Sequence, residues 1–153
     1  FMAIRTGANV TNRQVIYEEG GGTRGLNIYI FNGQLYFAGW NLASDGPGAP
    51  WGFLSANTAI AANTTYILGY IYNGNSSTTG TIQCFLNGNL FATIANVGSL
   101  YSHNPAVLGA EISGSYYETG SSNTNGKYFA GDIAEFIFYN TNVNIAQRII
   151  IQN

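Results

Sequence analysis

The chain has 153 residues, enough to bury the core of one domain. Hydrophobic residues make up 46% and charged residues only 8%, against about 25% charged residues in an ordinary globular domain. With a formal net charge of −2 and five Lys and Arg residues, no basic stripe is available for a phosphate backbone, which argues against nucleic-acid binding.

Runs of β-branched and aromatic residues alternate with Gly, Asn, Ser and Thr clusters, which is typical of β-strands. In chain order, the predicted strands are Phe1–Thr6, Gln14–Glu18, Leu26–Phe31, Gln34–Trp40, Trp51–Ser55, Tyr66–Tyr72, Thr81–Leu86, Leu90–Ala95, Ala106–Glu111, Ser115–Thr119 and Tyr128–Tyr139. A polar loop is predicted over Gly120–Gly126. No segment approaches the roughly 20 apolar residues of a membrane span. No signal peptide precedes the first strand, so we expect a piece of a longer precursor.

Asn-Gly pairs predict two tight hairpins. Asn32-Gly33 joins Leu26–Phe31 to Gln34–Trp40, and Asn87-Gly88 joins two later strands. Asn-Gly supplies the positive φ angles that a type I′ turn requires.

The last predicted strand has apolar residues on both faces, so we expect it to be central and covered on both sides, like Tyr66–Tyr72. Glu135 within it is expected to be buried and to accept hydrogen bonds inside the sheet. After this strand, Asn142 or Asn144 is expected to cap a short helix that contains Ile145, Ala146, Arg148, Ile149 and Gln152. The pattern predicts an all-β, antiparallel two-sheet jelly-roll sandwich with a short C-terminal helix.

The stretch from Tyr128 to Asn140 resembles the closing strand of laminin-G-like (concanavalin-A-like) jelly rolls of the bacterial cell-surface type. It has an aromatic, a small residue, Gly, an acid, Ile, a small residue and an acid, then an alternating run that ends in Tyr-Asn. The segments 14–21, 25–30, 85–88 and 146–148 are similar to further parts of that family in the same order. Family members usually begin with one or two more strands, so the resemblance implies that the domain 1–153 lacks its first strands.

The ionisable residues form no catalytic pattern, so we expect no enzymatic activity. His103 is the only histidine and is expected in a solvated loop, without the partners of a zinc site or a triad. Asp132 and Glu135 are three residues apart, which predicts opposite faces of a strand rather than a glycosidase pair. Cys84 is the only cysteine and is expected to be a small buried hydrophobe.

The loop between Trp40 and Trp51 is the candidate ligand site. Sugar rings stack on aromatic side chains, while Asn, Asp and Tyr bond their hydroxyls in shallow sites with few charges. The predicted ligand-binding residues are Trp40, Asn41, Asp45, Trp51, Tyr101, His103 and Tyr117, with Tyr116 as a further contributor. The alternative for both tryptophans is burial in the core.

Calcium is a possible ligand because the resembled family often binds it. Asp45 could join loop carbonyls, although no Asp-rich loop supplies the six to eight oxygens that calcium prefers. The alternative is a simple Asp-Gly turn. No other cofactor is expected.

Two functions remain open. The first is an extracellular carbohydrate-binding or adhesion module of a larger bacterial surface protein, with a glycan or a neighbouring surface protein as its partner. The second is a structural module that packs against other subunits, since interface cores lose charge and gain Tyr and Trp. In that case another segment completes the sheet by β-augmentation. Exposed tryptophans favour the first function, and an apolar patch or an open sheet edge at Phe1–Thr6 favours the second.

Overall fold

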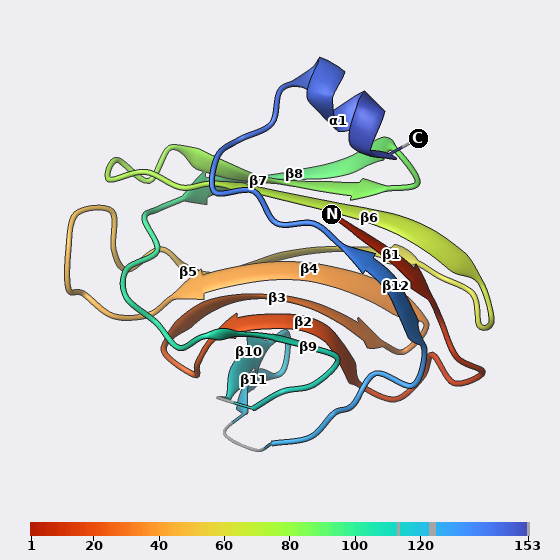
Figure 1. Cartoon of the computed structure of the whole chain (residues 1–153). Coiled ribbons are helices and arrows are strands. Elements are labelled where there is room, and N and C mark those ends of the chain that lie inside the picture. Colours follow the sequence, from red (N-terminus) through yellow and green to blue (C-terminus); the bar gives the residue numbers. More distant parts are fainter. Residues whose placement is uncertain (113, 123–124, 153) are drawn as a thin grey trace.

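The chain folds into two antiparallel β-sheets packed face to face, with one short helix at its C-terminal end (Figure 1). The computed structural model describes residues 1–112, 114–122 and 125–152. The predicted all-β, two-sheet jelly-roll sandwich with a short C-terminal helix is confirmed. Among the described residues, no helix is both long and apolar enough to cross a membrane.

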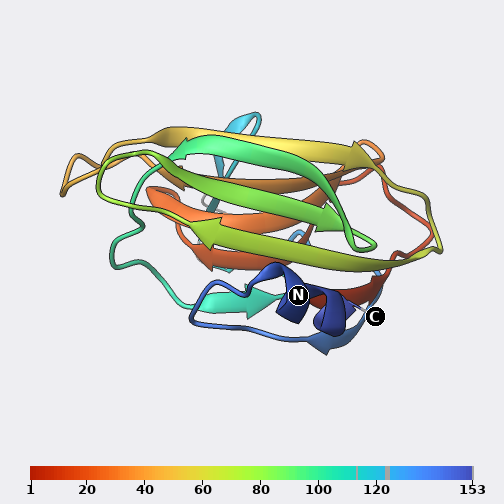
Figure 2. The same ribbon diagram turned by 90° about the horizontal axis from the view of Figure 1, so that it is seen from above.

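Consecutive strands mostly belong to the same sheet. From edge to edge, sheet A consists of β12 (Asp132–Phe136), β1 (Met2–Arg5), β6 (Thr65–Asn73), β7 (Gly80–Leu86) and β8 (Asn89–Val97). Sheet B consists of β5 (Gly52–Ala59), β4 (Gln34–Asn41), β3 (Arg24–Phe31), β2 (Gln14–Gly20) and β9 (Ala106–Leu108), so that β2 to β5 lie in one sheet and β6 to β8 in the other. The hairpin of β10 (Ser115–Tyr117) and β11 (Gly120–Ser122) lies against the outer face of sheet B. The helix α1 (Ile145–Gln152) lies over sheet A (Figures 1 and 2).

Both predicted Asn-Gly hairpins are present. Asn32 and Gly33 have φ angles of 51° and 72° between β3 and β4, and Asn87 and Gly88 have 49° and 79° between β7 and β8. Both turns therefore have the left-handed backbone of a type I′ turn, which matches the twist of the flanking strands.

The main core lies between the two sheets. Alternate residues of facing strands point inward, so that Ile28 and Phe37 of sheet B meet Leu68 and Ile82 of sheet A. Cys84 is fully buried here, as expected, and burial raises the pKa of its thiol to about 12.

A second, smaller cluster covers the outer face of sheet B. Val15, Tyr29, Ala38 and Tyr117 are buried there. The Tyr29 ring stacks on Tyr36 with centroids 4.7 Å apart and meets Tyr117 edge to face at 4.9 Å. Sheet B is thus covered on both faces in this region.

The prediction of a central closing strand is wrong, because β12 is an edge strand that, among the described strands, pairs only with β1. A β-bulge places the extra residue Ala134 opposite the Ala3–Ile4 step, which breaks the alternation of the faces. Phe136 lies opposite Met2, and Ile133 lies opposite Ile4, so both face the core side.

Because of the same bulge, the expected positions of two acidic residues are wrong. Asp132 lies opposite Arg5, and Glu135 lies opposite Ala3, so the two carboxylates share the outer face instead of lying on opposite faces. Glu135 is exposed there rather than buried among hydrogen-bond donors.

Two further local predictions concern the C-terminal third of the chain. The predicted loop Gly120–Gly126 begins with strand β11, which pairs with β10; Asn123 and Thr124 lie outside the described residues. Asn144 caps α1, because its Oδ1 accepts from the Gln147 N–H at 3.0 Å while Gln147 Oε1 accepts from the Asn144 N–H at 2.8 Å.

Candidate functional site

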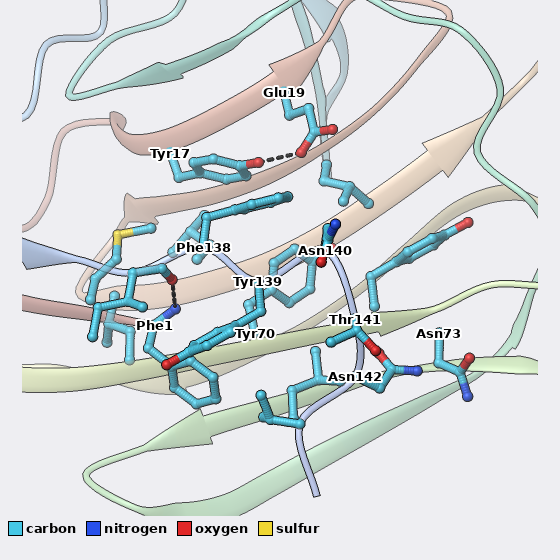
Figure 3. A pocket seen from close by; sticks show the side chains of 18 of the residues that line it. Phe1, Tyr17, Glu19, Tyr70, Asn73, Phe138, Tyr139, Asn140, Thr141 and Asn142 are labelled. Atoms are coloured by element: carbon cyan, nitrogen blue, oxygen red, sulfur yellow. Dashed lines mark hydrogen bonds between the residues drawn. The ribbon is translucent and has the colours of Figure 1, made fainter. Parts of the chain in front are cut away.

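A cleft of about 560 Å³ opens at one corner of the sandwich, between β6 and the segment that follows β12. Its floor is the inner face of β2 and β3, where Leu26 and Ile28 lie. Figure 3 shows Tyr17 and Glu19 of β2 facing Tyr70 and the segment 139–142 across this space. The lining is rich in aromatic rings, namely Phe1, Tyr17, Tyr70, Tyr72, Phe136, Phe138 and Tyr139.

Hydrogen bonds and ring contacts fix the walls of the cleft. The Tyr70 hydroxyl donates to the Ala38 carbonyl at 2.9 Å, and the Tyr72 hydroxyl donates to the Gly98 carbonyl at 2.6 Å. The Tyr17 ring stacks on Phe136 with centroids 5.9 Å apart. These side chains are therefore ordered before any ligand enters, which lowers the entropic cost of binding.

A polar group closes the end of the cleft nearest the loop 98–104. The Glu19 carboxylate accepts a hydrogen bond from the Tyr17 hydroxyl through Oε2, and its Oε1 lies 2.6 Å from Nε2 of His103. Nδ1 of His103 lies 2.6 Å from the Tyr101 carbonyl. Both ring nitrogens of His103 thus face oxygen atoms, one from the backbone and one from the Glu19 carboxylate.

Three phenol groups of the cleft, those of Tyr17, Tyr70 and Tyr72, stay neutral at ordinary pH. Burial raises the pKa of Tyr70 well above its usual value and that of Tyr72 to about 12. Burial, followed by the hydrogen bond to Glu19, also raises the pKa of Tyr17. The cleft thus presents apolar ring surfaces, phenol hydroxyls and a carboxylate that already contacts His103, an environment suited to an apolar, uncharged ligand.

The described residues offer little for a metal. No group of three or more His, Cys, Asp or Glu side chains in the described part of the chain is arranged to hold one. Asp45, the candidate calcium ligand, forms an ion pair with Arg24.

The two tryptophans of the predicted sugar site are part of the core, with 0% of Trp40 and 8% of Trp51 exposed. Their indole N–H groups donate to the carbonyls of Gly21 at 2.9 Å and Ser99 at 3.0 Å. Glycines make room for the rings, since a Cβ on Gly25 would lie 2.7 Å from Trp40. The alternative of core burial thus describes both tryptophans, and neither ring is exposed for stacking on a sugar.

The other predicted ligand-binding residues separate into two groups. Asn41 is buried and braces two loops, with its Nδ2 donating to the Ser99 carbonyl at 3.3 Å and its Oδ1 accepting from the Ala43 N–H at 3.2 Å. Tyr117 is buried on the opposite side of sheet B, where its hydroxyl donates to Glu111 at 2.7 Å. Neither residue faces the cleft.

Asp45, Tyr101 and His103 do come together, at one rim of the sandwich. Arg24 pairs with Asp45 and donates to the Ser102 carbonyl at 3.2 Å, while the Tyr101 hydroxyl donates to the Pro47 carbonyl at 2.6 Å. A shallow polar pocket of about 360 Å³ lies here, lined by 21–24 and 102–104. His103 lines both this pocket and the cleft.

The cleft itself was not predicted from the sequence, which left Tyr17, Glu19, Tyr70 and Phe138 unassigned. A signal for part of it exists in β6, where Tyr66, Leu68, Tyr70 and Tyr72 alternate with other residues and so share one face. Comparison with protein-family models, curated proteins and solved structures gives no match to this chain.

Proposed function

We propose that this domain is a non-catalytic protein-binding module of an extracellular assembly, which packs against a neighbouring polypeptide through the cleft. The observation that carries the proposal is that exposed aromatic side chains line the rim of the cleft. Phe136, Phe138 and Tyr139 line its rim, and 65% of Phe138 is exposed. Soluble proteins rarely leave such rings uncovered beside a groove unless a partner covers them.

The chemistry of the surface supports a protein partner. Interface cores are depleted of charge and enriched in aromatic residues, and only 8% of this chain is charged. Exposed apolar side chains also occur on α1, namely Ile145, Ile149 and Ile150. A partner that covered the cleft rim and this helix would bury apolar area that the isolated domain leaves in water.

Carbohydrate binding at the polar rim is the second candidate. The observation that favours it is the pocket beside Arg24 and His103, where backbone and side-chain polar groups converge. The burial of Trp40 and Trp51 removes the stacking surfaces from this candidate, so it ranks below protein binding.

Two screens on the same immobilised domain separate these functions. A library of random twelve-residue peptides displayed on phage is expected to yield binders, and a glycan array is expected to be negative. Binding on the glycan array, together with a peptide screen that yields no binders, would favour carbohydrate binding over protein binding.

Matched variants locate the binding surface. Phe138→Ser at the cleft rim is expected to lose the selected peptides. Tyr128→Ser removes a ring that is 72% exposed and does not line the cleft, so it is expected to keep them. Equal binding by both variants would show that the cleft is not the site.

A further inference from the structure

Side-chain donors hold the start of the loop 98–104, which joins β8 to β9. The Gly98 carbonyl accepts from the Tyr72 hydroxyl at 2.6 Å. The Ser99 carbonyl accepts from the Trp51 indole N–H at 3.0 Å. Burial raises the pKa of Tyr72 to about 12, and an indole N–H only donates. These two contacts therefore do not change between about pH 5 and pH 8.

The end of the loop depends on the His103 ring, which lies between two oxygen atoms. Its Nδ1 is 2.6 Å from the Tyr101 carbonyl oxygen, and its Nε2 is 2.6 Å from Oε1 of Glu19 on β2. A neutral imidazole carries one N–H, so it donates to only one of these oxygens and turns a lone pair toward the other. The imidazolium donates to both. The position thus favours a ring with one more proton than neutral imidazole has.

The other polar groups around the ring keep their charge state over the same range. Among the described residues, the charged side chains that line the two pockets beside His103 are Glu19 from β2 and Arg24 from β3. Arg24 is already paired with Asp45. The Tyr17 hydroxyl donates to the second Glu19 oxygen, and burial raises the pKa of this phenol. Of these side chains, histidine is the one that ordinarily changes charge between about pH 5 and pH 8.

We propose that the contact between His103 and Glu19 is a pH-sensitive switch, which holds the end of the loop 98–104 against β2. In the protonated state, the ring donates to both Tyr101 and Glu19. As the pH rises through the range in which histidine loses its proton, one of these hydrogen bonds is lost, and residues 101–104 detach from β2. His103 lines both the cleft and the polar pocket, so this detachment changes the walls of both. The switch goes beyond the proposed function, because it does not depend on what either pocket binds.

NMR relaxation of the full chain tests the switch. At about pH 5, the backbone amides of Ser102, His103 and Asn104 are expected to have order parameters of about 0.85, the value of rigid backbone. At about pH 8, the order parameters of the same amides are expected to fall below about 0.6, as in a flexible segment. Unchanged order parameters across this range would overturn the proposal.

The loop 74–79 is a control within the same chain. Its Ser77 and Thr79 N–H groups donate to Oδ1 of Asn75 at 3.0 Å and 3.1 Å, and the segment contains only Gly, Asn, Ser and Thr. These two amides are expected to keep their order parameters at both pH values. An equal change in the two loops would also overturn the proposal, because such a change would not originate at His103.

Two variants test the chemistry of the contact. In Glu19→Gln, the new amide can donate as well as accept. A neutral His103 ring can then donate to Tyr101 through Nδ1 and accept from this amide through Nε2, so the end of the loop is expected to stay rigid at about pH 8. His103→Gln cannot ionise, and the order parameters of its loop are expected to be the same at both pH values. A loop that loosens in both variants as it does in the parent would contradict the switch.

Discussion

The carboxylate of Glu19 and the ring of His103, 84 positions apart in the chain, meet with 2.6 Å between Oε1 and Nε2. This contact joins β2 to the loop between β8 and β9 at the edge of the cleft. The Tyr17 hydroxyl donates to the other oxygen of the same carboxylate. Glu19 thus holds a wall of the cleft and its adjoining loop in one arrangement.

Replacing Glu19 tests this role. Glu19→Gln removes the charge from a partly buried pair, so we expect the free energy of unfolding to fall by about 1–2 kcal/mol in urea titrations. The matched control is Asp45→Asn, which breaks the pair with Arg24. The Asp45 side chain is 43% exposed, so the expected loss is below about 1 kcal/mol. A larger loss for the Asp45 variant would contradict the assigned role of Glu19.

Tryptophan emission tests the placement of the two indoles. Both rings lie in the core, so the emission is expected to be blue-shifted and to resist iodide quenching. Trp40→Ala is expected to lower the free energy of unfolding by about 3–5 kcal/mol, the cost of a large core cavity. Efficient quenching in the native state, or a Trp40→Ala variant as stable as the parent, would contradict the burial of these rings.

The thiol of Cys84 makes stability depend on alkaline pH. Burial raises its pKa from 9.0 to about 12, so the folded state favours the protonated thiol. The resulting stabilisation is complete below pH 9 and is lost as the pH rises toward 12, because the unfolded thiol ionises first. Relative to Cys84→Ala, the parent is expected to lose about 1 kcal/mol more between pH 8 and pH 10.

Reactivity provides a second check on the same residue. The native thiol is expected to react with DTNB only as fast as the chain unfolds, because its sulfur is fully buried. Rapid stoichiometric labelling at pH 8 without denaturant would show that Cys84 is accessible.

The predictable features were those that local chemistry controls. The Asn32-Gly33 and Asn87-Gly88 turns follow from the backbone preferences of their own residues. The edge position of β12 depends on its pairing with β1, 130 residues earlier, and on the bulge at Ala134, neither of which alternation within one segment reveals.

The site was harder to predict because its parts are brought together by the fold. The burial of Trp40 depends on the space left by Gly25 on the neighbouring strand. The contact of Tyr17 and Glu19 with His103 depends on a strand and a loop that are distant in sequence. The Trp-flanked loop therefore looked like a binding surface, whereas the accessible aromatic rings lie around the cleft.

Binding of the phage-selected peptides tests the central claim most directly, that the domain binds a polypeptide through the cleft. Phe138 lines the cleft and is 65% exposed, whereas Tyr128 is 72% exposed and does not line it. The selected peptides are expected to bind the parent chain and Tyr128→Ser equally and to lose affinity for Phe138→Ser. Peptides that bind Phe138→Ser as tightly as the parent chain would contradict the account.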